Sequence, residues 1–354
     1  MNKNILILLL AGGVGDVMLS LAALKPLKEL YKGCRITMMV KKGMESIVGL
    51  CPLADDILPV EGGDLRGKNF DYWLKEVKKR RFDIGIALWS RASEAHLLFR
   101  AGIPVRVGQD SRLLYSFLFS HKVSVRSEHG DLKSHWTQVM LDYVRAIGAE
   151  ASEAEIPIII PDDGSVEGMK KLLEDISGGK GPFWGLQVCK GLAVTPDAWP
   201  CRYFASLGDA ICRRLGGTVV LTGSERELPV IECVADMMNS PHCITAGKTS
   251  LTDLVSMMRS LSGFVAPDTG PGHIAALAGI PVVSIFALKS DFPSRWKPFG
   301  RLAEAVVPEK RSCPVKNCIK EKCSRCFECY NDIDPDYAAE RLAFLCGLAG
   351  GENN

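Results

Sequence analysis

Two glycine-rich turns, far apart in the chain, constrain the fold more than any other feature of the sequence. The first turn, Gly12–Asp16, directly follows the apolar run Ile5–Ala11, and the second, Pro267–His273, directly follows the run Gly263–Ala266. Each turn lies between a strand-like run and a helix-like pattern. Such a turn leaves backbone N–H groups at the positive end of a helix dipole, where phosphate groups bind. The two turns predict two α/β halves facing one cleft, with the carboxylate of Asp16 beside it.

Length, composition and charge limit the class of protein. A chain of 354 residues is too long for one ordinary core and indicates two domains. With 47% apolar and 24% charged residues the composition is typical of a soluble globular protein. The net charge of +2 argues against a general nucleic-acid binder. The apolar run Ile5–Ala11 is too short to span a bilayer and makes a poor signal peptide, so we expect a cytoplasmic protein.

Strand-like runs alternate with helix-length patterns along the whole chain, which is typical of parallel sheets covered by helices. In the first half the predicted strands are Ile5–Ala11, Ile36–Val40, Asp83–Leu88, Val105–Gly108 and Ile156–Ile160. The predicted helices there are Val17–Leu30 and Trp136–Ile147. Pro26 is expected to kink or shorten the first of these helices. The sequence therefore predicts an α/β fold with a domain junction near the end of the last run, at residues 163 and 164.

The second half repeats the alternation after a Gly- and Pro-rich breaker at residues 178–182. Its predicted strands are Phe183–Val188, Val219–Leu221, Phe264–Ala266 and Val282–Phe286. Its predicted helices are Val166–Ile176, Tyr203–Leu215, Leu228–Met238, Leu251–Leu261, Ile274–Ala278 and Asp336–Leu348. The expected organisation is a domain of residues 1–163, a second domain of residues 164–335 and a closing helical segment, 336–354.

A dinucleotide-binding fold is the nearest alternative for the first turn. That fingerprint needs G-x-G-x-x-G and an acid at the end of the second strand to bind the ribose. Here Gly13-Val14-Gly15 is followed by Met18 at the third glycine position, and the second strand ends in Val40-Lys41-Lys42. The two lysines would suit a 2′-phosphate, so an NADP-dependent oxidoreductase remains the weaker alternative. The pattern also places Asp16 first in a helix, where a capping role is the simplest interpretation.

Basic residues are concentrated between Lys75 and Arg126. This stretch holds eleven Lys or Arg residues against four acidic ones. Solvated helix faces are the simpler interpretation of such a bias. The alternative is a surface that binds an anionic substrate or anionic lipid headgroups.

The thirteen cysteines fall into eight scattered residues and one cluster, Cys313, Cys318, Cys323, Cys326 and Cys329. The scattered ones are expected to be small buried hydrophobic residues. In the cluster, Cys318, Cys323, Cys326 and Cys329 have spacing that suits a structural zinc site, and part of it matches a plant-type ferredoxin pattern. A structural loop without metal is the other interpretation, and the spacing does not decide between the two.

With these motifs in order, the chain resembles the family 9 glycosyltransferases, the ADP-heptose:lipopolysaccharide heptosyltransferases. The resemblance extends over nearly the whole length. It rests on Gly13–Val17, on Trp199-Pro200, on Leu221–Glu225, on Ala246–Leu251 followed by Pro267–His273, and on Trp296–Gly300. The order of a G-V-G-D turn near the start and a D-T-G-P-x-H turn later is the most specific part of the match.

The resemblance implies a GT-B architecture of two Rossmann-like domains, with the active site between them. Residues 1–163 would bind the acceptor and residues 164–335, with the Cys-rich segment 313–329, would bind the nucleotide-sugar. The helix in 336–354 would cross back to the first domain. Family members invert the anomeric centre and require no metal cofactor, so none is expected here beyond the open question of a structural zinc.

The resemblance also assigns roles to individual residues. Asp16 would be the general base that takes the proton from the acceptor hydroxyl, with Gly13 and Gly15 forming the acceptor loop. Glu225 would contact the nucleotide ribose. The contacts to the donor diphosphate and sugar would be Asp268, Thr269, Gly270, Gly272 and His273.

One position departs from the family pattern. The family usually has a lysine two residues before the Trp-Pro pair, where it reaches the donor phosphates, and this chain has Asp197 there. Lys190, Arg202 or Lys248 would have to substitute. The expected reaction is heptose transfer from ADP-heptose to the Kdo or heptose of a lipopolysaccharide inner core, at the inner face of the membrane. A family member with another nucleotide-sugar and surface glycan, and a non-catalytic nucleotide- or glycan-binding protein of this fold, are the alternatives.

Overall fold

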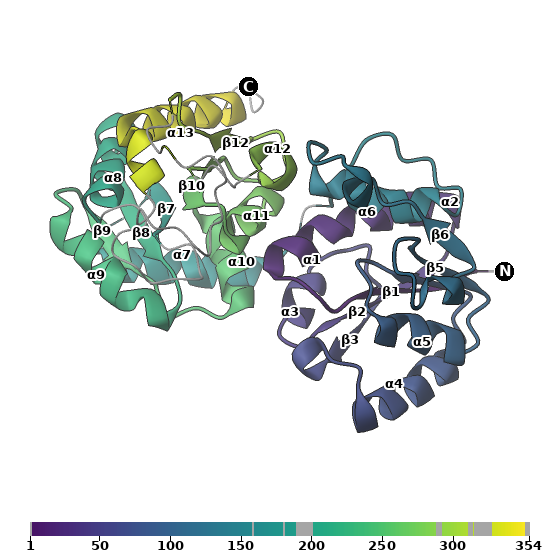
Figure 1. Ribbon diagram of the computed structural model, residues 1–354. Coiled ribbons are helices and arrows are strands. Elements are labelled where there is room, and N and C mark those ends of the chain that lie inside the picture. Colours follow the sequence, from purple (N-terminus) through teal and green to yellow (C-terminus); the bar gives the residue numbers. More distant parts are fainter. Residues whose placement is uncertain are drawn as a thin grey trace. The chain divides into compact units, whose positions relative to one another are not determined.

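The computed structural model describes residues 2–157, 159–179, 181–188, 201–287, 292–310, 314 and 328–350. The chain folds as two compact units, Met1–Ile160 and Pro161–Asn354. The junction predicted between residues 163 and 164 falls at the start of helix α7 (Asp163–Ser177), all of which belongs to the second unit. Each unit is an α/β fold built on one parallel sheet (Figure 1).

The first unit contains a six-stranded parallel sheet in the order β3-β2-β1-β4-β5-β6. Its strands are β1 (Asn4–Leu9), β2 (Arg35–Lys41), β3 (Asp56–Val60), β4 (Ile84–Ala87), β5 (Val105–Gln109) and β6 (His121–Val123). The central strand β1 is apolar throughout its buried part, as a strand covered on both faces must be. Its neighbours are β2 on one side and β4 on the other.

Helices cover both faces of this sheet. The α-helices of the unit are α1 (Val14–Ser20), α2 (Leu24–Leu30), α3 (Glu45–Val48), α4 (Gly67–Arg80), α5 (Ala92–Arg100) and α6 (Trp136–Arg145). Short 3₁₀ helices are η1 (Leu21–Ala23), η2 (Glu61–Gly63), η3 (Ser116–Leu118) and η4 (Arg126–His129). Helices α4 and α5 pack together on one face with η3, and α1, η1 and α6 pack together on the other.

The predicted helix Val17–Leu30 is interrupted as expected from Pro26. The chain passes from α1 through the 3₁₀ turn η1 into α2, where Pro26 lies in the first turn. Proline lacks an N–H and its ring clashes with the carbonyl four residues earlier, which is Ala22 in this chain. The tighter turn η1 lies where that clash would occur.

The second unit repeats the strand order of the first. Its six parallel strands lie in the order β12-β11-β10-β7-β8-β9, which places the first strand of the unit, β7, between the second and the fourth. The strands are β7 (Phe183–Gln187), β8 (Thr218–Thr222), β9 (His242–Ile244), β10 (Gly263–Pro267), β11 (Val282–Ile285) and β12 (Ala303–Val306).

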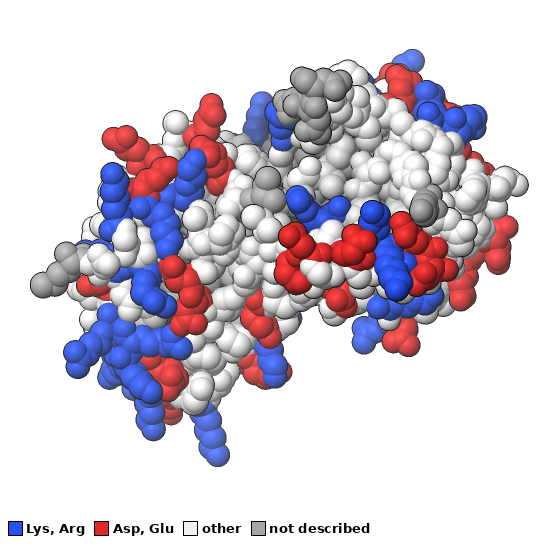
Figure 2. Space-filling view, turned by 180° about the vertical axis from the view of Figure 1, so that it is seen from behind, with Lys and Arg blue, Asp and Glu red and all other residues white. Residues whose placement is uncertain are grey.

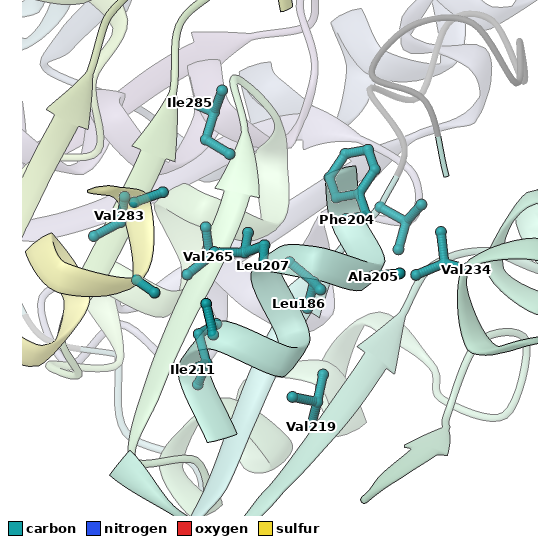
Figure 3. Packing of buried hydrophobic residues seen from close by; sticks show 14 of the residues in the cluster. Leu186, Phe204, Ala205, Leu207, Ile211, Val219, Val234, Val265, Val283 and Ile285 are labelled. Carbon is teal, nitrogen blue, oxygen red and sulfur yellow. The ribbon is translucent and has the colours of Figure 1, made fainter. Parts of the chain in front are cut away.

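Its α-helices are α7 (Asp163–Ser177), α8 (Cys201–Leu215), α9 (Leu228–Met237), α10 (Leu251–Ser260), α11 (Gly270–Leu277), α12 (Pro293–Trp296) and α13 (Pro335–Gly350), with 3₁₀ helices η5 (Glu225–Glu227) and η7 (Glu328–Asp332). Helices α8, α9 and α13 cover one face of the sheet, and α7, α10 and α11 cover the other. Figure 3 shows the first of these interfaces, where Phe204, Leu207 and Ile211 of α8 pack among strand residues such as Leu186 and Val265.

Helix α13 packs on α8 and on strands β10, β11 and β12, all within the second unit. It buries Ala338, Ala339, Leu342 and Leu345 in the same core. The crossing of the 336–354 segment to the first unit, implied by the family resemblance, stays a prediction. Within the described ranges, no helix has both the length and the apolar character that spanning a bilayer requires.

One strand predicted in the first unit is not present in the structure. The run Ile156–Ile160 is not a strand at any of its described residues, 156, 157, 159 and 160. Pro157 has no N–H to donate to a sheet, Ile160 is 59% exposed, and the Ile160 N–H donates to the carbonyl of Leu50 outside any strand. An apolar run here marks the connection between the units and not a further buried strand.

Candidate functional site

Both sheets have a point where successive connections leave toward opposite sides. In the first unit it lies between β1 and β4, and in the second between β7 and β10. In open parallel sheets, ligands bind outside the carboxyl ends of the strands at such a switch point. The two glycine-rich turns singled out from the sequence follow β1 and β10, so each lies at the switch point of its own unit.

Asp16 lies on the first turn of α1, at the carboxyl end of β1. The helix begins at Val14, with Gly13 in extended conformation as its N-cap, so Asp16 is the third helical residue and not the first as predicted. The reason is that Val14 and Gly15 already have helical geometry. The Asp16 carboxylate reaches back, and its Oδ2 accepts a hydrogen bond from the Gly13 N–H at 2.8 Å. The capping role expected from sequence is therefore present.

Gly12 is the residue that makes room for this carboxylate. It has a φ of +89°, a region that residues with a side chain rarely adopt. A Cβ at Gly12 would lie 2.5 Å from Oδ2 of Asp16, whereas a Cβ at Gly13 would meet no atom within 4 Å. The position of the Asp16 side chain thus depends on Gly12 far more than on Gly13.

Burial raises the pKa of Asp16 above its ordinary value of 3.8, although hydrogen bonds from the backbone, chiefly from Gly13, oppose the increase. Removing a carboxylate from water disfavours its charged form, and the same effect makes it a stronger base when ionised. Asp16 is half-buried, so solvent still reaches it. A half-buried carboxylate with a raised pKa at a switch point is suited to accept a proton.

Trp89 lies next to this turn and was missed by sequence reasoning. It is the second residue after β4, and the residue between them, Leu88, donates its N–H to the carbonyl of Leu8 in β1. Trp89 has a φ of +50°, unusual for a bulky residue and characteristic of functional sites. Its N–H donates to the hydroxyl of Tyr143 at 3.0 Å. The sequence offered one signal for Trp89, which is its position directly after the strand predicted at Asp83–Leu88.

An aromatic and charged cluster surrounds Trp89. The ring of Trp136, at the start of α6, meets it edge-on at 5.2 Å, and the guanidinium of Arg112 lies 5.8 Å from its ring centre. Arg112 forms an ion pair with Glu128 at 2.6 Å. Aromatic faces suit sugar rings and guanidinium groups suit carboxylates and phosphates, so this cluster has the chemistry of a site for an anionic glycan.

The basic stretch Lys75–Arg126 is partly paired and partly exposed. Ion pairs join Arg80 to Asp56, Arg91 to Glu94, Arg112 to Glu128 and Arg126 to Asp142. Helix α4 presents Lys75, Lys78 and Lys79 to solvent. Figure 2 shows Lys and Arg side chains gathered at the lower left of the view, over the part of the first unit where α4 lies. The simpler interpretation, solvated helix faces, accounts for α4.

The second turn lies between β10 and α11. Pro267 ends the strand, Asp268 follows half-buried, and Thr269 is the extended N-cap of α11, its hydroxyl donating to the Pro267 carbonyl at 3.2 Å. Helix α11 starts at Gly270. The Gly272 N–H already donates to the Thr269 carbonyl at 3.2 Å. A helix start of this kind at a switch point favours an anion.

Gly272 and His273 face the protein more than the solvent. A Cβ at Gly272 would meet Oγ of Ser284 in β11 at 3.4 Å and Pro298 at 3.5 Å, so the glycine allows α11 to pack close to the sheet. His273 is only 5% exposed. Both residues lie directly behind the turn, and a direct donor contact, as predicted for them, remains a prediction.

Glu225 and Lys248 lie on neighbouring loops at the carboxyl edge of the same sheet. Gly247 has a φ of +71°, a Cβ there would lie 3.2 Å from the Cα of Glu225, and the Gly247 N–H donates to the Gly223 carbonyl at 3.1 Å. Glu227 is buried and accepts hydrogen bonds from Ser224, which fixes the loop and leaves Glu225 and Lys248 exposed. The structure thus brings these predicted residues to the edge that carries Asp268–His273.

Several predicted residues lie outside the described part of the chain. They are Lys190, Asp197, Cys318, Cys323 and Cys326. Cys329 is described and is buried in the core of the second unit. Within the described ranges no three His, Cys, Asp or Glu residues are grouped so as to hold a metal ion. The metal interpretation of the cysteine cluster therefore stays a prediction.

The family of the chain follows from comparison with known proteins. The model of glycosyltransferase family 9 (heptosyltransferase) matches residues 73–325, which include the second turn, Glu225 and Lys248. The chain belongs to glycosyltransferase family 9. It is therefore a glycosyltransferase, as the resemblance predicted. The matched range does not include Asp16, so its role as a base, implied by the family resemblance, stays a prediction.

Individual family 9 relatives are distant in sequence and close in fold. Lipopolysaccharide heptosyltransferase 2 of Salmonella typhimurium is 26% identical over 294 residues, 79% of this chain and 82% of the relative. The crystal structure of a family 9 glycosyltransferase from Veillonella parvula superposes with a TM-score of 0.82 at 18% identity, over 98% of both chains. The structure of Escherichia coli ADP-heptose lipopolysaccharide heptosyltransferase II gives 0.74 at 19% identity, over 98% of this chain and 99% of that one. The predicted α/β, GT-B-type fold is confirmed.

Proposed function

We propose that this family 9 enzyme transfers a heptose from ADP-heptose to the Kdo or heptose of a lipopolysaccharide inner core, with inversion at the anomeric carbon. Relatives carrying this activity in their names support the sugar and the glycan. The observation that carries the proposal is that the two switch points present different groups, one suited to accept a proton and one suited to bind an anion. One presents a half-buried carboxylate of raised pKa, and the other presents a glycine-rich helix start suited to a diphosphate.

Asp16 acts as the general base in this proposal. An acceptor hydroxyl donates its proton to the Asp16 carboxylate while the hydroxyl oxygen attacks the anomeric carbon of the heptose. The new bond forms on the face opposite the bond to the phosphate oxygen, so a single displacement inverts that carbon. The raised pKa caused by burial helps the carboxylate accept the proton. A positioned base of this kind contributes about a hundred- to ten-thousand-fold to the rate.

The second unit receives the leaving group. The bond between the anomeric carbon and the phosphate oxygen breaks with its electron pair, so negative charge grows on the ADP diphosphate. The Gly270 N–H at the start of α11 and the exposed ammonium of Lys248 are suited to stabilise that charge. Asp268, Thr269, Gly272 and His273 complete the turn, and Glu225 is suited to accept hydrogen bonds from the ribose hydroxyls. Lys190 is the further candidate for the phosphates.

The first unit binds the acceptor in this proposal. Kdo carries a carboxylate and the inner core carries phosphates, so the acceptor is an anion. The Trp89–Arg112 cluster next to the Asp16 turn offers an aromatic face and a guanidinium to such a glycan. Basic residues elsewhere between Lys75 and Arg126 add a longer-range attraction. We place the acceptor at the inner face of the membrane, where a cytoplasmic enzyme meets a lipid-linked glycan.

The proposal is tested by ADP release from ADP-L-glycero-D-manno-heptose with Kdo-lipid A as acceptor. We expect release that depends on the acceptor in the wild type and a kcat at least about a hundredfold lower in Asp16→Ala, because the base is lost. Release that is equal in the two proteins would remove Asp16 from the mechanism. No release with either Kdo-lipid A or its heptosylated form would exclude the proposed donor and acceptor pair.

Asp253→Ala provides a matched control. Asp253 is also the third residue of its helix, α10, and its Oδ2 accepts from the Ser250 N–H at 2.9 Å, as Asp16 accepts from Gly13. Both substitutions remove one such cap, which costs about 1 kcal/mol of helix stability. Only the loss of Asp16 should lower kcat, so the control separates the chemical role from the structural one.

Asp197 favours a second candidate. An acidic residue where the family has a phosphate-binding lysine would disfavour the charge that grows on a leaving diphosphate, which suits a protein that binds its ligand without turnover. A screen of nucleotide-sugars by thermal shift and product release separates the two candidates. A thermal shift without release for every donor would favour the binding protein.

A further inference from the structure

The loop between β5 and β6 carries three large apolar side chains that nothing in the described chain covers. Leu113 is 93% exposed, Leu114 is 88% exposed and Phe117 is 68% exposed. We name these three residues the apolar tip. Single exposed apolar residues are ordinary, but three within five positions of one loop form a patch, and such patches mark interaction sites.

The apolar tip is held out by a fixed loop. Between and after its members, Tyr115, Leu118 and Phe119 are buried in the core under α4 and α5. The Tyr115 hydroxyl donates to the Ser90 carbonyl at 2.5 Å, and the Ser116 hydroxyl donates to the Gln109 carbonyl at 2.6 Å. Because these neighbours are anchored, the loop cannot turn its leucines inward without losing its own core contacts.

A fourth apolar side chain lies beside the loop. Phe99, in the last turn of α5, is 50% exposed, and α5 packs against η3, which contains Phe117. The guanidinium of Arg106 connects the two elements: it lies 5.5 Å from the Phe99 ring centre, and its Nε donates to the Leu118 carbonyl at 2.7 Å. The apolar surface therefore extends from the tip onto the end of α5.

The surroundings of the tip are cationic. Between Arg91 and Arg126 the chain has six Lys or Arg residues and two acids, Glu94 and Asp110, and two of the six, Arg112 and Arg126, pair with Glu128 and Asp142. Glu94 is buried and paired with Arg91, and Asp110 lies 3.4 Å from His129. Arg100, the last residue of α5, and Lys122, in β6 directly after the loop, are exposed. An apolar tip with a cationic base is the arrangement that binds the headgroup region of an anionic bilayer.

We propose that Leu113, Leu114 and Phe117 insert into an anionic lipid bilayer, while Arg100 and Lys122 contact its headgroups. Arg112, the residue before the tip, lies over Trp89 at the carboxyl end of β4, so the inserted loop is connected to the edge that carries Asp16. Insertion thus brings this edge to the lipid surface. The consequence for catalysis rests on the proposed function, whereas the lipid binding itself does not.

Vesicle binding tests the insertion directly. The full chain is mixed with vesicles of phosphatidylcholine alone or with one third phosphatidylglycerol, and the bound fraction is measured by flotation. We expect binding to the anionic vesicles, reduced by salt because headgroup attraction is screened. Leu113→Gln together with Leu114→Gln should lower the partition coefficient at least about tenfold, since each buried leucine side chain contributes about 1.5–3 kcal/mol.

Two controls keep the result specific. Met237→Gln removes a side chain that is 50% exposed at the end of α9 in the second unit, and it should leave vesicle binding unchanged. Thermal melting of the double variant should match the wild type, because both leucines are exposed. Absence of wild-type binding to anionic vesicles, or equal binding of the double variant, would overturn the proposal.

Activity and mass measurements separate the remaining outcomes. The double variant should keep wild-type kcat/KM on a water-soluble, delipidated acceptor and lose activity only on acceptor in vesicles. If the wild type shows no transfer on either acceptor but binds vesicles through the leucines, the proposed function fails and the insertion stands. If the wild type is a dimer by light scattering and the double variant is a monomer, the tip is an interface between two copies and the lipid proposal is wrong.

Discussion

The two units share one strand order but differ in what they place at the carboxyl edge of the sheet. In both, the first strand lies between the second and the fourth, and all strands are parallel. The first unit surrounds this edge with a carboxylate, two tryptophans and an arginine. The second unit surrounds it with glycines, with Thr269 and with two loops that expose Glu225 and Lys248.

This difference shows that the shared scaffold sets positions while the loops set chemistry. A turn whose N-cap side is closed by its own carboxylate, as Asp16 closes Gly13, does not invite an anion to that N–H. In α11 the residue at the position of Asp16 is Gly272, which has no side chain to accept from the Thr269 N–H, so this turn keeps the character of an anion site. The comparison therefore supports the division made in our proposal, in which proton transfer is assigned to the first unit and diphosphate binding to the second.

The largest effect is expected from Gly12→Ala, which tests whether proton transfer depends on the first unit alone. A methyl group at this position would lie 2.5 Å from the Asp16 carboxylate, and a φ of +89° is itself unfavourable for alanine by about 1–2 kcal/mol. We expect kcat to fall about a hundredfold with the donor KM unchanged, because the second unit is untouched. The matched variant Gly13→Ala meets no atom within 4 Å and should keep nearly full activity. Equal losses in the two variants would contradict the role given to Gly12.

A smaller effect is expected from Lys248→Ala in the second unit. The side chain is exposed, so loss of its attraction to the donor phosphates should raise the donor KM about fivefold, with the acceptor KM unchanged. Lys171→Ala, an exposed lysine of α7, is the control and should change neither constant. Steady-state kinetics with each substrate varied in turn make the measurement. A rise in the acceptor KM alone would contradict this role, because Lys248 would then act in acceptor binding and not in donor binding.

The smallest and sharpest effect is a pH dependence. Because burial raises the pKa of Asp16 above 3.8, the acid limb of kcat/KM should have its midpoint above pH 3.8. A midpoint at or below that value, in protein shown to be folded by circular dichroism, would contradict a base whose pKa is raised by its partial burial.

Stability should follow the same group with a defined sign. A raised pKa means that the folded protein favours protonated Asp16, so this stabilisation is complete below pH 3.8 and is lost as pH rises through the raised value. The free energy of unfolding of the wild type, relative to Asp16→Asn, should therefore decrease over that interval. Urea unfolding at several pH values makes the measurement.

Sequence patterns located the interior of each sheet and missed its edges. The correctly predicted strands include β1, β4, β7 and β10, which are interior and buried on both faces. The four that were not predicted, β3, β6, β9 and β12, are the outer strands of the two sheets. Interior parallel strands appear as unbroken apolar runs. Outer strands are short and carry polar residues, as in the Ala-Glu-Ala-Val segment of β12, so their pattern resembles a loop.

The site was predictable where its residues are consecutive and hidden where they are not. The turns at Asp16 and at Asp268–His273 are each encoded within a few positions. The cluster of Trp89, Arg112 and Trp136 joins residues from three connections, and only the sheet brings those connections together. The same holds for Gly247, which supports Glu225 across two loops. No local pattern marks such contacts.

Helix α13 has a consequence for the order in which the protein is made. Its apolar residues pack in the core with α8 and strands β10 to β12, and among the described elements of that unit it is the last to be synthesised. The sheet of the first unit is built only from strands β1 to β6, all of which are synthesised before this helix. The first unit can therefore fold while translation continues. The second unit must wait for α13, with the apolar face of its sheet incompletely covered until then. A nascent chain stalled before residue 335 would therefore carry one finished unit and one that chaperones recognise.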